Sequence, residues 1–256
     1  MGSEPTTAST KGKLLGSAFR ERWRFVLDTL GTIAFIAVSA TIVWATISER
    51  RTASAPAAPA ARQARKEPAP PTQPLSLESA AIQGSRTAKV AVIEFSDFQC
   101  PYCGKFARET LPDLEAKYVK SGQVLFAFQP LPLPMHPFAE KAAEAAECAG
   151  RQGRFWEMHD SLFRNQEELD EAHLQARATD EHLDRAQFDA CLGGQAAGLV
   201  QQSAALGKTL TISGTPTFFL GTVQGDGKVK ITQRFTGAMP TAQLATALDH
   251  LLTVTK

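Results

Sequence analysis

The sequence predicts a mixed α/β domain that follows an N-terminal extension of different composition. Short β-branched apolar runs alternate with segments whose apolar residues recur every three or four positions, which indicates strands and helices. A C-x-x-C pair follows the first of these runs, and a Thr-Pro turn precedes the last ones. Hydrophobic residues make up 43% and charged residues 21%, as in ordinary globular proteins, and the net charge of +1 indicates no nucleic-acid partner.

The extension contains a charge-free run over residues 29–48. A helix of this length spans roughly 30 Å, the thickness of a bilayer's hydrocarbon core. We therefore expect an N-terminal tail over residues 1–24 and one transmembrane anchor over residues 25–48, in contact with the lipid bilayer. A cleaved signal peptide is the alternative, because Ala53-Ser54-Ala55 fits a small-x-small cleavage pattern. Basic residues flank the run on both sides, so charge alone does not orient it.

Residues 49–75 are rich in Ala and Pro and poor in large apolar side chains. Such a segment buries too little surface to fold, and its prolines keep it extended. We expect a Pro/Ala-rich disordered linker here, followed by one folded domain over residues 76–256.

The folded domain is predicted to begin with a β-α-β unit. Residues 88–96 form an apolar, β-branched run typical of a buried strand, and residues 123–129 form another. Between them, residues 101–120 have helical periodicity, with Pro112 expected to kink or divide the helix. This order implies two parallel strands joined by a right-handed crossover.

A helical block is expected at about residues 137–208, where apolar residues recur at helical spacing. A short strand at residues 218–220, an Asp-Gly turn and a strand at residues 229–237 then indicate a hairpin. Residues 240–252 close the chain as a helix. The order is therefore β-α-β, a helical block, and β-β-α.

Several side chains of the block have two interpretations. Phe155, Trp156, Met158 and Phe163 resemble a ligand patch, but their helical spacing favours core packing. His136 is interpreted as a residue at the start of a helix, with lining of the rim of a site as the alternative.

The pair Cys100 and Cys103 carries the chemistry. Cys100 lies where a helix begins, and unpaired backbone N–H groups and the helix dipole stabilise a thiolate there. Cys103 is one turn further on, close enough to form a disulfide with it. A C-x-x-C within β-α-β indicates a redox dithiol. A metal site needs further ligands, and Cys148, Cys191 and the five histidines are scattered, so we expect no metal.

The motifs FSDFQCPYC and GTPTFF, separated by the helical block, resemble those of the DsbA-like thioredoxin-fold thiol–disulfide oxidoreductases. The likeness runs from about residue 75 to the C-terminus. It implies a thioredoxin fold with an inserted α-helical domain, and disulfide exchange with cysteine-containing proteins outside the cytoplasm, without an organic cofactor. A membrane-bound or soluble redox partner would recycle the dithiol. Disulfide chemistry is useful in an oxidising space, so we expect a single pass through a bacterial inner membrane, with residues 1–24 in the cytoplasm and the domain in the periplasm or on the extracellular face.

The resemblance assigns roles to particular residues. Cys100 would be the nucleophile and Cys103 the resolving thiol. Pro216 matches a cis-proline, and the backbone of Thr215 would pair with an extended substrate strand. Glu94 matches an acidic position that passes protons to the resolving sulfur. The alternatives are an ordinary trans Thr-Pro turn and a strand-end glutamate that faces water.

Two further pairs of residues bear on the redox potential of the dithiol and on the stability of the helical block. Pro101 and Tyr102 would contact substrate, and they look like the corresponding pair of glutaredoxins. Strongly oxidising members often have His before the second cysteine, so Tyr102 predicts a less extreme redox potential. Cys148 and Cys191 lie in two helices of the block, and in an oxidising compartment a structural disulfide between them is favoured over two buried free thiols.

An oxidase that promotes disulfide formation is the favoured function, because we see no dimerisation domain of the kind that isomerases use. A reductase or isomerase of the same fold is the first alternative. A tethered, chaperone-like binding module with an incidental dithiol is the second.

Overall fold

A computed structural model describes residues 68–255 of the chain. The expected tail, anchor and most of the expected linker lie outside these residues. Within residues 68–255, no helix has both the length and the apolar character that a membrane crossing requires.

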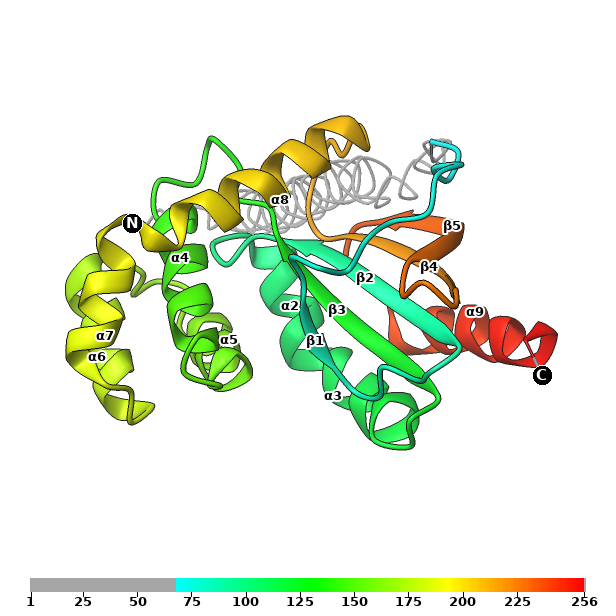
Figure 1. The fold of residues 1–256 in the computed structure, drawn as a ribbon, viewed down its shortest axis with the longest axis horizontal. Helices are drawn as coiled ribbons and strands as arrows, with labels where there is room; N and C mark the ends of the chain where they lie inside the picture. The colour runs from blue at the N-terminus through cyan, green and yellow to red at the C-terminus, as the bar shows by residue number, and fades with distance from the viewer. Residues whose placement is uncertain (1–67, 256) are drawn as a thin grey trace, which may run out of the picture. The chain divides into compact units, whose positions relative to one another are not determined.

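A five-stranded sheet forms the centre of the described fold, in the order β1-β3-β2-β4-β5 (Figure 1). The strands are β1 (Ala81–Gln83), β2 (Val90–Ser96), β3 (Val124–Pro130), β4 (Thr217–Val223) and β5 (Val229–Thr236). β2 and β3 are parallel, as the sequence predicts, and all other neighbours are antiparallel. Strand β1 was not predicted, because three residues are too few to show a period.

The burial of each strand follows from its sequence. All seven residues of β2 and all seven of β3 are buried, as expected for continuous apolar runs in central strands covered on both faces. β5 alternates between buried and exposed residues, because its second face is open along an edge.

One face of the sheet is covered by four helical segments. They are α2 (Pro101–Glu109), α3 (Leu111–Leu114), the π-helical turn η1 (Glu115–Val119) and α9 (Thr241–Val254). Phe106 and Leu248 pack there against Phe126 and Phe218 of the sheet. The predicted division of the first helix is confirmed, because α2 and α3 meet at Thr110. Pro112 lies in the first turn of α3, where no backbone N–H is needed.

The other face is covered by α8 (Ala197–Thr209) and by the segment that enters the domain. Leu75 forms two hydrogen bonds with Val229, from Leu75 N–H at 2.9 Å and from Val229 N–H at 2.8 Å. Leu75 and Leu77 are both buried against the sheet. The packed fold therefore begins at Leu75, one residue before the predicted domain boundary.

The helical block is present and lies beside one end of the sheet (Figure 1). It contains α4 (Ala139–Gly150), α5 (Phe155–Arg164), α6 (Glu171–Asp180), α7 (Arg185–Ala190) and the π-helical turn η2 (Cys191–Gln195). Phe155, Met158 and Phe163 are buried in its core, which confirms that they are packing residues. The expected disulfide joins Cys148 of α4 to Cys191 of η2, with 5.6 Å between their Cα atoms.

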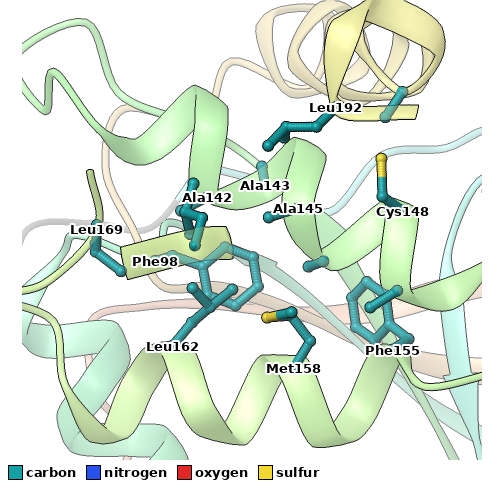
Figure 2. Close-up of a cluster of buried hydrophobic side chains, with 14 of the residues drawn as sticks. Phe98, Ala142, Ala143, Ala145, Cys148, Phe155, Met158, Leu162, Leu169 and Leu192 are labelled. Carbon is teal, nitrogen blue, oxygen red and sulfur yellow. The ribbon is translucent and has the colours of Figure 1, made fainter. Parts of the chain in front are cut away.

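One aromatic side chain connects this block to the dithiol. Phe98 lies two positions before Cys100, and its ring inserts between α4 and α5, near Ala142 and Leu162 (Figure 2). Its ring centroid is 4.8 Å from that of Phe163. The turn that carries the dithiol is therefore anchored in the core of the inserted helices.

Candidate active site

The dithiol lies at the junction of β2 and α2. Cys100 is the N-cap residue of α2 and is 4% exposed. Pro101 occupies the first helical position, where its missing N–H costs little. Cys103 lies one turn inside and is fully buried. Both cysteines are free thiols and both are buried, with Cys100 at the end of the helix and Cys103 one turn inside it.

The surroundings of Cys100 favour its thiolate. Hydrogen bonding from the Cys103 thiol is the largest cause that lowers the pKa of Cys100, to about 5. The Thr215 side chain and the backbone N–H groups of Cys103 and Tyr102 lower this pKa further, against the opposing effect of burial. Because the ordinary pKa of a cysteine is about 8.5, Cys100 is ionised at neutral pH.

Cys103 has the opposite character. Burial raises the pKa of Cys103 well above its ordinary value, and the negative charges of Cys100 and Glu94 add to the effect. The backbone N–H of Asp97 lies 3.4 Å from Cys103 Sγ. Cys103 therefore keeps its proton until a base removes it, which suits a resolving thiol.

Glu94 is a buried carboxyl group in the central strand β2. It is 1% exposed, so the alternative of a glutamate that faces water is wrong. Burial is the largest cause that raises the pKa of Glu94 to about 8, and the charge of Cys100 raises it too. The Ser96 hydroxyl donates to Glu94 Oε1 at 2.7 Å and opposes this shift. A carboxyl group that titrates near neutral pH can give and take protons beside the dithiol.

The Thr-Pro turn lies against the dithiol. The peptide bond between Thr215 and Pro216 is cis, as the resemblance implied, and Thr215 O lies 3.4 Å from Cys100 Sγ. Thr217 Oγ1 donates to Gly214 O at 2.7 Å, and Gly237 N–H donates to Pro216 O at 2.8 Å. These bonds fix the turn at the start of β4, although 115 positions separate Thr215 from Cys100 in the sequence.

Tyr102 and Pro101 form the exposed border of the site. Tyr102 is 63% exposed, and Pro101 is exposed beside it. A side chain of this size, apolar and next to the reactive sulfur, suits contact with a substrate. Their role in substrate binding stays a prediction.

Sequence reasoning missed Gln166, which lies in the loop between α5 and α6. Its amide nitrogen Nε2 donates to Phe98 O at 2.8 Å and to Cys100 O at 2.9 Å. Arg108 of α2 donates to Gln166 Oε1 at 3.2 Å. Gly104 leaves room for this contact, because a Cβ there would collide with Gln166 Oε1. A glutamine in a polar loop gives no sequence signal for such a role.

Asp97 was also missed as a site residue. Its carboxylate Oδ2 accepts hydrogen bonds from Leu133 N–H at 2.7 Å and from His136 Nδ1 at 2.8 Å. His136 lies just before α4, where its carbonyl oxygen accepts from Ala139 N–H at 3.2 Å, and its side chain contacts Asp97. His136 also lines a hollow of about 520 Å³ between the 131–137 segment and α8. The sequence shows that Asp97 lies six positions before Cys103, but it gives no signal that Leu133 and His136 bond to Asp97.

In residues 68–255, no three histidine, cysteine or acidic side chains are grouped so that they could hold a metal ion.

A mixed sheet with a dithiol at the start of its first long helix, a facing Thr-Pro turn and an inserted helical block defines a thioredoxin-fold protein with a redox centre. Residues 76–234 match the model of a family described as thioredoxin. This range is more than half of the 256 residues, and the chain therefore belongs to that family.

Solved structures support the same fold. Wolbachia pipientis alpha-DsbA1 superimposes with a TM-score of 0.62 at 22% identity, over 71% of this chain and 94% of that one. Oxidised BdbD from Bacillus subtilis gives a TM-score of 0.61 at 21% identity, over 73% of this chain and 100% of that one. At these identities the likeness shows the fold, with its DsbA-like helical insertion.

One curated relative is a Na(+)/H(+) antiporter NhaA 3 from Salinispora tropica, 40% identical over 149 residues. The match covers 57% of this chain and 22% of that protein. The chain thus spans under a quarter of the length of this relative.

Proposed function

We propose that the protein is a thiol–disulfide oxidoreductase that acts on cysteine-containing proteins outside the cytoplasm, with oxidation of substrate dithiols as its main direction. The observation that carries the proposal is the asymmetry of the dithiol. Cys100 is held as a thiolate with a pKa of about 5, and Cys103 is held as a thiol. In such a pair, Cys100 forms and breaks the disulfide with the substrate, and Cys103 resolves the mixed disulfide.

The oxidising reaction starts from a Cys100–Cys103 disulfide. A substrate thiolate attacks Cys100 Sγ, a mixed disulfide forms, and Cys103 leaves and takes a proton. A second substrate thiolate then attacks the substrate sulfur of the mixed disulfide and displaces the Cys100 thiolate. The substrate loses two electrons and gains a disulfide, and the dithiol of the protein becomes reduced.

The stabilised thiolate also supports this direction. A thiolate of low pKa leaves readily, and stabilising it stabilises the reduced protein. A disulfide whose reduced form is stabilised is a stronger oxidant. Glu94 fits the proton step, since its carboxyl group, with a pKa of about 8, can protonate the departing Cys103 sulfur and recover the proton later.

The setting is proposed from the sequence. The charge-free run over residues 29–48 supports a membrane anchor, and the usefulness of disulfide exchange in an oxidising space supports a periplasmic domain. Each turnover leaves the dithiol reduced. A redox partner that accepts two electrons is therefore required for further cycles.

The test is the redox potential of the Cys100–Cys103 couple in glutathione buffers, together with oxidation of a reduced, unfolded protein. We expect a potential closer to roughly −120 mV than to roughly −270 mV. We also expect the Cys100→Ala variant to be inactive. A potential near roughly −270 mV would make the protein a reductase, and full activity of the variant would leave only a binding module.

A further inference from the structure

We propose that Asp97 is a positioning residue that holds a substrate-facing loop, residues 131–138, against the dithiol. The inference rests on the proposed function, because it concerns how protein substrates reach the same sulfur. It goes further by assigning a substrate surface and the residue that keeps this surface in place.

Asp97 contacts both the dithiol and the loop of residues 131–138. Its side chain is 0% exposed, and its backbone N–H lies 3.4 Å from Cys103 Sγ. Its carboxylate accepts from Gln99 N–H at 2.7 Å, from Leu133 N–H at 2.7 Å and from His136 Nδ1 at 2.8 Å. A buried carboxylate needs such donors, and each bond to it is stronger than a bond between neutral groups. One residue thus contacts both the resolving sulfur and the loop.

The loop needs external hydrogen-bond partners because of its sequence. It reads LPLPMHPF and contains prolines at positions 132, 134 and 137, none of which has a backbone N–H. Three of its remaining N–H groups bond to the strand end and the turn that lead to Cys100. Leu131 N–H donates to Ser96 O at 2.7 Å, Leu133 N–H to Asp97 Oδ2, and Phe138 N–H to Gln99 Oε1 at 2.9 Å.

Helix α8 supports the loop from behind. A Cβ on Gly207 would approach Leu131 Cδ1 to 2.7 Å, so the Leu131 side chain packs directly on the backbone of α8. The loop is therefore held on one side by α8 and on the other by Asp97. Of these two supports, only Asp97 also contacts the dithiol.

The loop, whose Phe138 N–H bonds to Gln99 next to Cys100, exposes apolar side chains. Met135 is 72% exposed and Phe138 is 44% exposed, and Tyr102 is 63% exposed next to Cys100. In residues 68–255 the fourth large exposed apolar side chain is Val254, near the end of α9. Exposed apolar groups that gather at one place mark interaction sites.

The occupant we assign to this surface is the extended, apolar segment that flanks the reacting cysteine of an unfolded protein substrate. Its sulfur must bond to Cys100 in the mixed disulfide, so the residues beside it must lie over Tyr102 and its surroundings. Glutathione disulfide has no apolar side chains beside its cysteines, so it gains nothing from the exposed apolar groups of the loop. Asp97 should therefore matter more for protein substrates than for small ones.

The first variant is Asp97→Asn, which keeps the shape of the side chain and one acceptor oxygen. It replaces one of the two acceptor oxygens with an NH2 group, so either Gln99 N–H or the pair of Leu133 N–H and His136 loses its acceptor. We expect about tenfold lower kcat/KM for oxidation of a reduced, unfolded protein, mostly through KM, given the strength of hydrogen bonds to charged groups. The loss with glutathione disulfide should be clearly smaller, because that substrate has no apolar side chains to place on the loop.

Further variants keep the proposal testable if Asp97→Asn folds poorly. Met135→Ser with Phe138→Ser removes the exposed apolar groups, and His136→Ala removes one of the bonds to the loop. Both should raise KM for the protein substrate. His173→Ala is the matched control, because His173 Nδ1 bonds to Asp170 at 2.7 Å in the same way on α6, where both side chains are half-exposed.

The outcomes separate the two proposals. Wild-type KM for the protein substrate in both loop variants would overturn the inference. An equal loss with glutathione disulfide in Asp97→Asn would also overturn it, since Asp97 would then affect the chemistry itself. If wild type exchanged disulfides with neither substrate, the proposed function would fail, whatever the variants did.

Discussion

At the scale of single residues, the two cysteines of the dithiol have opposite acid–base properties although only two residues separate them. The N-cap position gives Cys100 the donors that a thiolate needs, and Cys103 is itself the most effective of them. Burial without comparable donors keeps Cys103 protonated. The position of each sulfur on the helix therefore decides its role.

The low pKa of Cys100 predicts the pH dependence of its alkylation. In the reduced protein, the rate of reaction of Cys100 with iodoacetamide should be nearly constant above about pH 6. It should fall about tenfold per pH unit below the pKa of about 5, as the thiolate is protonated.

The Cys103→Ala variant provides the comparison for this titration. It removes the largest cause of the low pKa, so the midpoint should move to higher pH. A midpoint near the value of an ordinary cysteine, about 8.5, in the wild type would contradict the assigned thiolate.

The raised pKa of Glu94 predicts how stability depends on pH. Between about pH 5 and 8, the unfolded chain has an ionised Glu94 whereas the folded protein keeps the proton, so folding stability falls as pH rises. Glu94→Gln should remove this loss. In a Cys100→Ser/Cys103→Ser background, its stability advantage should grow by about 1.4 kcal/mol per pH unit over this range.

Urea unfolding at several pH values measures this effect, with Glu167→Gln as control because Glu167 is exposed. Parallel curves for Glu94→Gln and its parent from pH 5 to 8 would show that Glu94 ionises normally in the folded protein. In the protein with its cysteines intact, Glu94→Gln should slow the step in which Cys103 gains or loses its proton, because the amide cannot exchange that proton.

At the scale of elements, the inserted helical block and the redox turn are joined by specific contacts. Phe98 inserts its ring among the helices, and Gln166 bonds to the carbonyl groups of Phe98 and Cys100. The block therefore holds the turn that carries the nucleophile.

Gln166→Ala is predicted to weaken this connection. The two carbonyl groups lose their side-chain donor, and Arg108 loses one acceptor. We expect a loss of about 1–3 kcal/mol in the free energy of unfolding and slower disulfide exchange at Cys100. Gln123→Ala is the control, because Gln123 is exposed and its side chain donates to Ser121 Oγ, two positions away, at 2.8 Å. Equal stability and exchange rates for the two variants would contradict the assigned role.

The disulfide between Cys148 and Cys191 is predicted to stabilise the block without contributing to the redox reaction. It closes a loop of 43 residues, and the chain-entropy model gives about 4 kcal/mol for that length. Cys148→Ala with Cys191→Ala should lower the free energy of unfolding by about this amount. Exchange at Cys100 should be unchanged at temperatures where the variant stays folded. An altered redox potential of the Cys100–Cys103 couple would point to a second redox role.

At the scale of the whole molecule, the elements with strong periodicity were predictable, and the contacts between them were not. The strands around residues 90 and 125, the helix after the dithiol and the final hairpin follow from local sequence. Cys100 and Cys103 were found because their chemistry depends on local position at a helix start. Pro216 was found through the resemblance.

Other features depend on tertiary structure and leave no local signal. Strand β1 exists because its three residues pair with β3, and a run that short has no readable period. Gln166 and His136 act through bonds to residues 66 and 39 positions away, respectively. Glu94 could be placed on a strand, but its complete burial depends on what covers both faces of the sheet.

The attachment of Leu75 to Val229 determines how the domain responds to tension. β4 starts beside the Thr-Pro turn and runs seven residues to its pairing with Val229, so Leu75 joins the sheet about 20 Å from the dithiol. A pull along the preceding chain would act first on the two hydrogen bonds between Leu75 and Val229, at the far end of β4. Force on the chain that precedes Leu75 is therefore applied to the sheet at a point distant from the dithiol.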